Sequence, residues 1–182
     1  MAQLVGFAGS LRKESFNQKL IEAASAAMPA GSALEVLTIS EVPLYNGDIE
    51  EAEGIPGSVA LIKDRIAAAD GLVIATPEYN GGIPGVAKNV MDWISRPGDD
   101  QPRVTHGKPV ALMGATPGGL GTAFSQAAWL QVLRTLRMRI WVSGGPFYLS
   151  SAFKSFDDSG QPDAELKQRL SDYMAGFVGS LA

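Results

Sequence analysis

The chain has 182 residues, no cysteine and a formal net charge of −4, from 15 Lys and Arg against 19 Asp and Glu. This length supports a single domain with its own core, and the missing thiols exclude disulfides and thiolate catalysis and favour a reducing compartment, the cytoplasm. The acidic balance disfavours nucleic acid as a partner, and no apolar run approaches the about 20 residues that a membrane span needs. We therefore expect one domain over residues 1–182, without nucleic-acid or membrane partners.

Short apolar runs alternate with longer segments of helical period along the whole chain. In chain order, strands are expected at residues 3–8, 33–39, 71–76, 109–115 and 139–144, and helices at 16–28, 57–69, 84–95, 121–137 and 163–179. Nearly continuous apolar strands are typical of a parallel sheet that is covered on both faces. The pattern predicts an α/β protein, a three-layer doubly wound domain with a five-stranded parallel sheet and helices on both faces.

Ligands in doubly wound sheets bind beyond the carboxyl ends of the strands, where the strand order reverses. The loop after the first strand reads GSLRKESFNQKL, at residues 9–20. Its hydrogen-bonding side chains stand where a helix begins, and the free N–H groups and dipole of a helix start favour an anion. These side chains are Ser10, Arg12, Ser15 and Asn17. The loop therefore predicts a site for a phosphate monoester.

The same loop also fits a purely structural interpretation, in which Ser15 and Gln18 form a capping box and Arg12 is a surface charge. The two interpretations are compatible, because a capping hydroxyl still has a proton to donate. Neither GxGxxG nor GxxxxGK[ST] occurs in the loop, so neither a dinucleotide fingerprint nor a Walker loop is predicted.

The loop after the third strand reads TPEYNGGIPG, at residues 76–85. Pro77 ends the strand, and the glycines at 81–82 permit backbone conformations or a close ligand approach that a Cβ would block. Tyr79 adds an aromatic ring and a hydroxyl. The pattern predicts a rigid shelf for a flat polar heterocycle. It also fits a long strand-to-helix connection in which a proline opens the helix and Glu78 is simply exposed.

The loop after the fourth strand reads GATPGGLGT, at residues 114–122, with four glycines in nine positions. Such glycine density lets the backbone approach a ligand closely, with N–H groups as donors. A generic turn before a helix is the plainer alternative. Three loops of this kind at one sheet edge favour a binding site.

The sequence lacks the residues that a Ser-His-Asp triad or a catalytic metal site would need. His106 is the only histidine, reads as a surface residue in a turn, and is not supported as a triad member by any GxSxG motif. Metal catalysis lacks cysteines, a second histidine and a close carboxylate cluster. We therefore expect no catalytic side chain and no metal, and a bound cofactor that carries the reaction.

Taken together, these segments resemble the NAD(P)H-dependent FMN reductases of flavodoxin-like fold, a family that includes bacterial quinone, chromate and azo reductases. The likeness runs through GSLRKESFN, PEYNGGIPGVAKNVMDWISRP and GATPGGLG, and the middle motif is the most specific. One departure is Gly82, where many relatives have Ser; a side-chain hydrogen bond is lost there, and the platform stays in place.

The resemblance implies that the three loops hold FMN. In the family, the first loop binds the phosphate, the PEYN loop lies against the isoalloxazine ring, and the backbone of the Gly-rich loop holds the pyrimidine side. By matching positions, the implied FMN contacts are Ser10, Arg12, Ser15 and Asn17 for the phosphate, Pro77, Glu78, Tyr79 and Asn80 for the ring, and Thr116, Pro117, Gly118 and Gly119 for the pyrimidine side.

The resemblance also implies a reaction: hydride transfer from NADPH or NADH to bound FMN, then to a small-molecule acceptor such as a quinone, azo dye, chromate or free flavin, in a ping-pong cycle. Backbone donors stabilise the charge that develops on the pyrimidine ring. Family members commonly form homodimers or homotetramers, so Trp93 and residues 95–103 and 145–156 are interface candidates.

Two alternatives use the same pocket. One is a flavodoxin-like electron carrier that docks to redox proteins without oxidising NAD(P)H. The modest net charge and the arginine in the phosphate loop argue against it, because carriers tend to be strongly acidic with a hydroxyl-rich loop. The other is a non-catalytic FMN-binding module that keeps the pocket and has lost turnover, although the three loops show no sign of having lost their binding residues.

Overall fold

The computed structural model describes residues 1–181. The strands are β1 (Gln3–Ala8), β2 (Ala33–Leu37), β3 (Gly71–Ala75), β4 (Pro109–Ala115), β5 (Arg139–Ile140) and β6 (Phe147–Leu149). The helices are α1 (Phe16–Ala26), α2 (Gly47–Glu53), α3 (Gly57–Ala68), α4 (Gly85–Ile94), α5 (Gln101–Thr105), α6 (Ala123–Thr135) and α7 (Ala164–Gly179), with a 3₁₀ turn η1 (Ala152–Lys154). All five expected helices are present, and their ends differ from the predicted ones by at most two residues.

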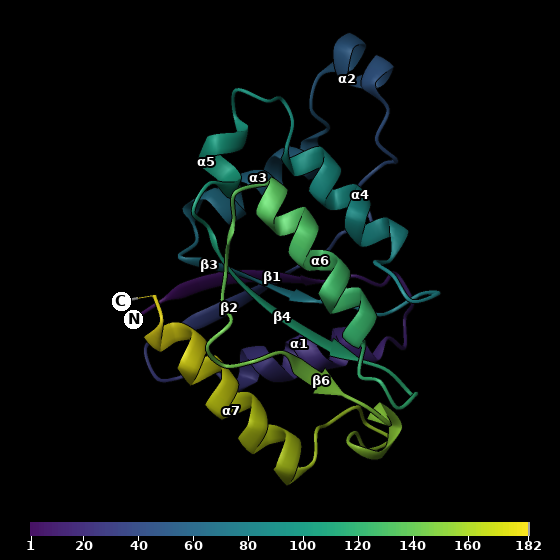
Figure 1. Cartoon of the computed structure of the whole chain (residues 1–182), viewed down its shortest axis with the longest axis vertical. Helices are drawn as coiled ribbons and strands as arrows, with labels where there is room; N and C mark the ends of the chain where they lie inside the picture. The colour runs from purple at the N-terminus through teal and green to yellow at the C-terminus, as the bar shows by residue number, and fades with distance from the viewer. Residues whose placement is uncertain (182) are drawn as a thin grey trace.

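The strands form one parallel sheet in the order β2-β1-β3-β4-β5, and β6 also pairs with β4. This is the flavodoxin-like order, with its switch point between β1 and β3. Figure 1 shows α1 and α7 on one face of the sheet and α3, α4 and α6 on the other. The predicted three-layer doubly wound architecture is confirmed. Among residues 1–181, no helix combines the length and the apolar character of a membrane span.

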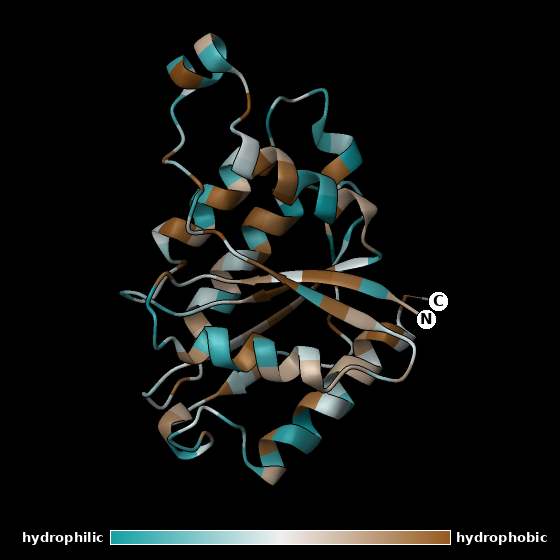
Figure 2. Ribbon diagram, turned by 180° about the vertical axis from the view of Figure 1, so that it is seen from behind, coloured by the Kyte–Doolittle hydropathy of each residue, from teal (hydrophilic) through white to brown (hydrophobic). Residues whose placement is uncertain are grey.

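Each face of the sheet has its own apolar core, because successive strand side chains point to opposite faces. In β1, Leu4 and Ala8 pack with α1 and α7, whereas Val5 and Phe7 pack with α3 and α4. All five residues of β3 are buried, as a central strand covered on both sides requires. The apolar strands between the two helix layers are visible in Figure 2.

The fifth strand differs from the prediction. It was expected over 139–144, but β5 ends at Ile140 and the pairing with β4 resumes at β6, so the sheet has six strands instead of five. The interruption contains Gly144, Gly145 and Pro146. Gly145 has φ 69°, the ring of Trp141 lies 2.1 Å from where a Cβ on Gly144 would be, and proline cannot donate to a ladder. The local backbone thus outweighs the apolar pattern of RIWVSG.

A side chain fills the hydrogen-bonding gap that this interruption leaves on β4. The hydroxyl of Tyr173, on α7, donates to the backbone oxygen of Leu112 at 2.7 Å. Tyr173 also packs edge-on against Trp141, with ring centroids 4.8 Å apart. Burial raises the pKa of Tyr173, so the hydroxyl keeps its proton and remains a donor.

The segment between β2 and α3 projects from the body of the domain and carries α2 (Figure 1). It is fastened to α4: the indole of Trp93 donates to the backbone oxygen of Pro43 at 2.8 Å, and the side chain of Asn89 accepts from the Tyr45 amide at 2.8 Å. Trp93 is fully buried within its own chain. Trp93 therefore packs against the body of its own domain, which is one of the two places that the sequence allows for it, and it is not an exposed interface candidate.

We expect Tyr173→Phe to lower the free energy of unfolding by about 1–2 kcal/mol, because the buried oxygen of Leu112 loses its donor. Urea denaturation at neutral pH measures the change. Tyr148→Phe is the matched control, since Tyr148 is partly exposed on β6 and its loss of a hydroxyl should cost less than about 0.5 kcal/mol. Equal effects of the two substitutions would contradict the role given to Tyr173.

Candidate functional site

The three loops singled out in the sequence meet at one edge of the sheet. The amide of Gly9, after β1, donates to the backbone oxygen of Ala75 at 2.8 Å, and the hydroxyls of Ser10 and Tyr79 lie 3.4 Å apart. The amide of Thr76, after β3, donates to the backbone oxygen of Met113 in β4 at 2.8 Å. Loops 9–17, 76–82 and 114–122 therefore lie together at the edge of the sheet beside the switch point between β1 and β3, and we call the region that they border the crevice.

In the first loop, Ser15 and Asn17 are buried and hold the loop in place. The Ser15 side chain accepts from the Gln18 amide at 3.3 Å and caps α1, while the Gln18 side chain donates to Glu22 at 2.8 Å. Only half of the expected capping box is thus formed. Asn17 reaches across to the end of β4, donating to the Ala115 oxygen at 2.8 Å and accepting from the Ala115 amide at 2.9 Å.

Ser10 and Arg12 are the more available members of this group. The Ser10 hydroxyl accepts from the Arg12 amide at 3.3 Å and is half-buried. Arg12 is exposed and forms no ion pair within residues 1–181. A free guanidinium and a hydroxyl beside the start of α1 suit a doubly charged phosphate.

The second loop is a tight hairpin. Tyr79 and Gly82 exchange both backbone hydrogen bonds, at 3.2 and 3.1 Å, across the two residues Asn80 and Gly81. These have φ 52° and 72°, the left-handed values that a type I′ turn requires and that an Asn-Gly pair favours. Pro77 is buried, whereas Tyr79, which flanks the turn, is 51% exposed. The expected shelf is a short, closed hairpin.

The base of this hairpin is tied to α6 through Thr76, which is buried. Its hydroxyl lies 2.9 Å from that of Ser125 and accepts from the indole of Trp129 at 2.9 Å. Glu78 adds a second tie, since one carboxylate oxygen accepts from the amides of Phe124 at 2.9 Å and Ser125 at 3.1 Å. Glu78 is half-buried and bonded, so it is not the simply exposed residue of the plainer interpretation.

The glycine-rich loop is hydrogen-bonded to residues 149–152, a contact that the sequence does not predict. Thr116 exchanges backbone hydrogen bonds with Leu149 and Ala152, both at 3.0 Å, and the Gly118 oxygen accepts from Ser151 at 2.9 Å. The Thr116 hydroxyl accepts from the Gly118 amide at 3.2 Å. The segment that follows β6 thus forms the back of this loop. Only the fold reveals that role, because the bonded residues lie 33 to 36 positions apart in the chain.

The glycines of this loop serve two different purposes. A Cβ on Gly114 would lie 1.8 Å from the hydroxyl of Thr122, so this glycine permits close packing within the protein. Pro117, Gly118 and Gly119 are exposed, and apart from Gly119 itself and its two chain neighbours, no atom within residues 1–181 lies within 4 Å of the place a Cβ would take on Gly119. That part of the backbone is accessible to a ligand.

The donor set fits a flavin mononucleotide. Arg12 and Ser10 supply charge and hydroxyl for a phosphate at the start of α1, the hairpin supplies an aromatic wall, and the exposed peptides of 117–119 supply polar backbone for a heterocycle. In residues 1–181, no group of three or more His, Asp or Glu side chains is placed to hold a metal ion. His106 is exposed and lies in the turn before β4, away from these loops.

Comparisons with known proteins find relatives that match most of this chain. The family model described as NADPH-dependent FMN reductase matches residues 2–154, which include all three loops. An NAD(P)H-dependent FMN reductase of Pseudomonas aeruginosa is 40% identical over 159 residues, which is 87% of this chain and 83% of the relative. A quinone reductase of Pseudomonas putida is 37% identical over 174 residues, covering 96% and 89%. The structure of FerB, a flavoenzyme NAD(P)H:(acceptor) oxidoreductase from Paracoccus denitrificans, superposes with a TM-score of 0.87 at 30% identity, covering 100% and 97%.

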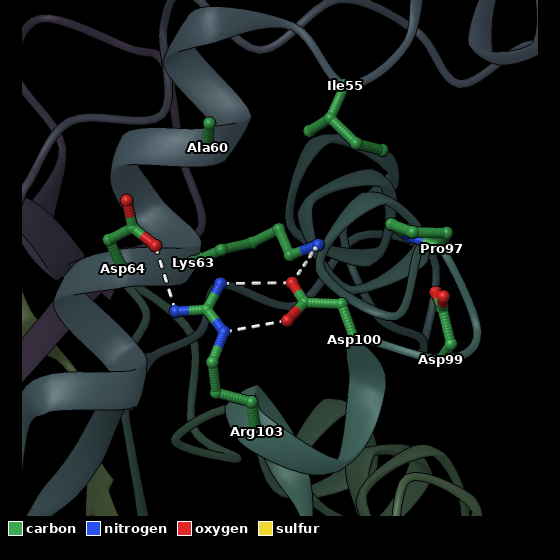
Figure 3. Close-up of a pocket in the computed structure, with 8 residues that line it drawn as sticks. All are labelled: Ile55, Ala60, Lys63, Asp64, Pro97, Asp99, Asp100 and Arg103. Atoms are coloured by element: carbon green, nitrogen blue, oxygen red, sulfur yellow. Dashed lines mark hydrogen bonds and ion pairs between the residues drawn. The ribbon is translucent and has the colours of Figure 1, made fainter.

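A cavity of about 450 Å³ lies outside this site, between α3, α5 and residues 97–100 (Figure 3). Both of its cations are paired: Arg103 binds Asp100 at 2.7 and 3.0 Å and Asp64 at 2.9 Å. Lys63, which is buried, binds Asp100 at 2.8 Å and the backbone oxygen of Arg96. Arg103 and then Lys63 hold the pKa of Asp100 well below its usual range. This network is structural, fastening α5 to α3.

We expect Lys63→Met to lower the free energy of unfolding by about 2 kcal/mol at pH 7, since Asp100 loses its buried partner. The pKa of Asp100 is depressed in the fold, so its contribution is present above the unfolded value of about 3.9 and is lost as the pH falls through the folded value. Arg103 still lowers the pKa of Asp100 in the variant, so the difference between variant and wild type should be constant above about pH 4 and shrink only at lower pH, where Asp100 is protonated in the folded variant. Urea denaturation across this range tests it, with the exposed Lys154→Met as control.

Proposed function

Because the chain belongs to the NADPH-dependent FMN reductase family, we propose that it is an NAD(P)H-dependent FMN oxidoreductase that passes electrons to a quinone or a similar small acceptor. The observation that supports this most strongly is the meeting of three family-like loops at one switch-point crevice, all within the matched residues 2–154. When bound, FMN supplies the group that takes a hydride from NADPH or NADH and yields electrons to the acceptor in a ping-pong cycle.

The protein's own residues would bind and orient this cofactor. Ser10 and Arg12, with the Ser15 hydroxyl at the start of α1, would hold the phosphate, and Asn17 would keep that loop against β4. The hairpin of Pro77, Glu78, Tyr79 and Asn80 would bound the ring. In residues 116–119, the amide of Gly119 would donate to the pyrimidine side, because Pro117 has no N–H and the other two amides donate to Leu149 and to the Thr116 hydroxyl. Backbone donors there would stabilise negative charge without a side chain that titrates.

Apolar side chains around the crevice support flat, apolar acceptors of the quinone type. Tyr79, Leu120 and Phe124 border it and are all more than half exposed. Exposed apolar groups next to a binding site gain free energy when they cover an aromatic ligand. An azo dye or a free flavin shares this flat aromatic character, whereas chromate does not.

We further propose a cytoplasmic homodimer or homotetramer. The absence of cysteine suits a reducing compartment. Residues 145–156 contain the exposed rings of Tyr148 and Phe153, and the projecting segment before α2 contains Leu44, whose side chain is 80% exposed. Apolar groups of this kind are typical of surfaces that a second subunit covers.

The proposed cycle predicts a spectroscopic sequence. Protein reconstituted with FMN and desalted should retain the visible flavin band, lose it on anaerobic addition of NADPH, and regain it on addition of 1,4-benzoquinone. A retained band that NADPH does not bleach would favour an electron carrier or a non-catalytic module. Protein that retains no flavin, and shows none bound in a fluorescence titration, would contradict the proposal.

We expect Arg12→Ala to raise the dissociation constant for FMN about tenfold or more, since a charge-assisted contact to the phosphate is lost. Lys13→Ala is the matched control, because Lys13 is an exposed cation at the neighbouring position, and its effect should stay below about threefold. Quenching of flavin fluorescence measures both constants. Riboflavin, which lacks the phosphate, should bind the Arg12 variant and the wild type alike.

A further inference from the structure

The helix α6 begins beside the glycine-rich loop with a cap position that does not serve it. The first N–H groups of a helix need acceptors from outside its own ladder. Thr122 occupies the cap position with φ 68°, and its hydroxyl accepts instead from the side chain of Gln126, at 3.1 Å. Thr122 also packs where a Cβ on Gly114 would be, so β4 holds its side chain in this orientation.

Glu78 replaces the missing cap from a distant part of the chain. Its carboxylate accepts from the amides of Phe124 at 2.9 Å and Ser125 at 3.1 Å, 46 and 47 residues further along. Both are among the first three residues of α6. A carboxylate at a helix start gains from the helix dipole as well as from the two hydrogen bonds.

This arrangement joins the two walls of the crevice through one side chain. Glu78 lies in the hairpin between Pro77 and Tyr79, and α6 starts where the glycine-rich loop ends. The ties made by Thr76 lie before the hairpin and fix only its base. The position of the hairpin relative to residues 116–119 therefore depends on the carboxylate of Glu78.

We propose that Glu78 is a positioning residue, whose side chain fixes the spacing between the hairpin and the glycine-rich loop by binding the start of α6. This inference rests on the proposed function, since the two walls are those proposed to hold FMN. Glu78 acts through the two loops, and its carboxylate is already engaged by two protein donors.

The experiment compares Glu78→Ala, Glu78→Gln and Asp163→Ala. Asp163 caps α7 by accepting from the Leu166 amide at 2.7 Å, so its substitution also removes one carboxylate from one helix start, away from the three loops. Glu78→Gln keeps a carbonyl oxygen that can accept from the same amides. Each variant is titrated with FMN by fluorescence quenching, and amide hydrogen exchange is recorded on the FMN-free proteins.

We expect Glu78→Ala to raise the dissociation constant for FMN about tenfold, Glu78→Gln less than about threefold, and Asp163→Ala not measurably. Exchange in Glu78→Ala should speed up at Phe124 and Ser125 and also at the hairpin amides of Tyr79 and Gly82, which Asp163→Ala leaves unchanged. Thermal melting should fall similarly for both alanine variants, which separates lost stability from lost positioning.

Two results would overturn the inference. One is a Glu78→Ala variant with wild-type FMN affinity and unchanged amide hydrogen exchange at Tyr79 and Gly82. Glu78 would then only cap α6 and would not position the hairpin. The other is a Glu78→Gln variant that binds FMN as weakly as Glu78→Ala while its α6 amides stay protected, which would mean direct contact with the flavin. If the wild type binds no FMN, the proposed function fails, and hydrogen exchange alone decides whether Glu78 links the two loops.

Discussion

The whole site depends on the register of three parallel strands. Ala8 of β1 pairs with Ala75 of β3, and Ala75 pairs with Met113 of β4. Ala8 and Ala75 end their strands, and β4 continues two residues beyond Met113, so the three following loops begin close together at one edge of the sheet. A slip of one residue would turn every side chain to the opposite face of the sheet, so the two apolar cores enforce this alignment. The crevice is therefore a consequence of how the core packs.

The sequence predicts most of this because long apolar patterns report burial directly. The five helices and the first four strands follow from periodicity, and the three loops follow from where those strands end. The sequence does not predict the short helices α2 and α5. The residues of α2 are exposed or half-buried and α5 has only five residues, so neither helix shows an apolar stripe of helical period. The sequence also does not predict the break in the fifth strand. The break arises from the backbone conformation at Gly145 and from the close packing of the Trp141 ring, and a hydropathy pattern reports neither of them.

In the candidate site, too, the sequence predicts some features and leaves others undetermined. The sequence predicts which loops form the crevice, but it does not distinguish side chains free to meet a ligand from those that hold the loops. Asn17 is paired with Ala115, 98 residues away, and Glu78 with the start of α6. Partners at such separations exist only in the folded chain. They preorganise the crevice, which a cofactor that must be held in one orientation requires.

The interrupted fifth strand has a consequence for how these molecules behave in a crowded solution. An uninterrupted strand at the rim of a sheet exposes a row of unpaired amides and carbonyls, to which another chain can add. Here that rim consists of β5 with two residues and β6 with three, separated by a bend that contains Pro146. Within residues 1–181, that side offers no long strand to which another chain could pair. The bend therefore protects the apolar sheet against aggregation.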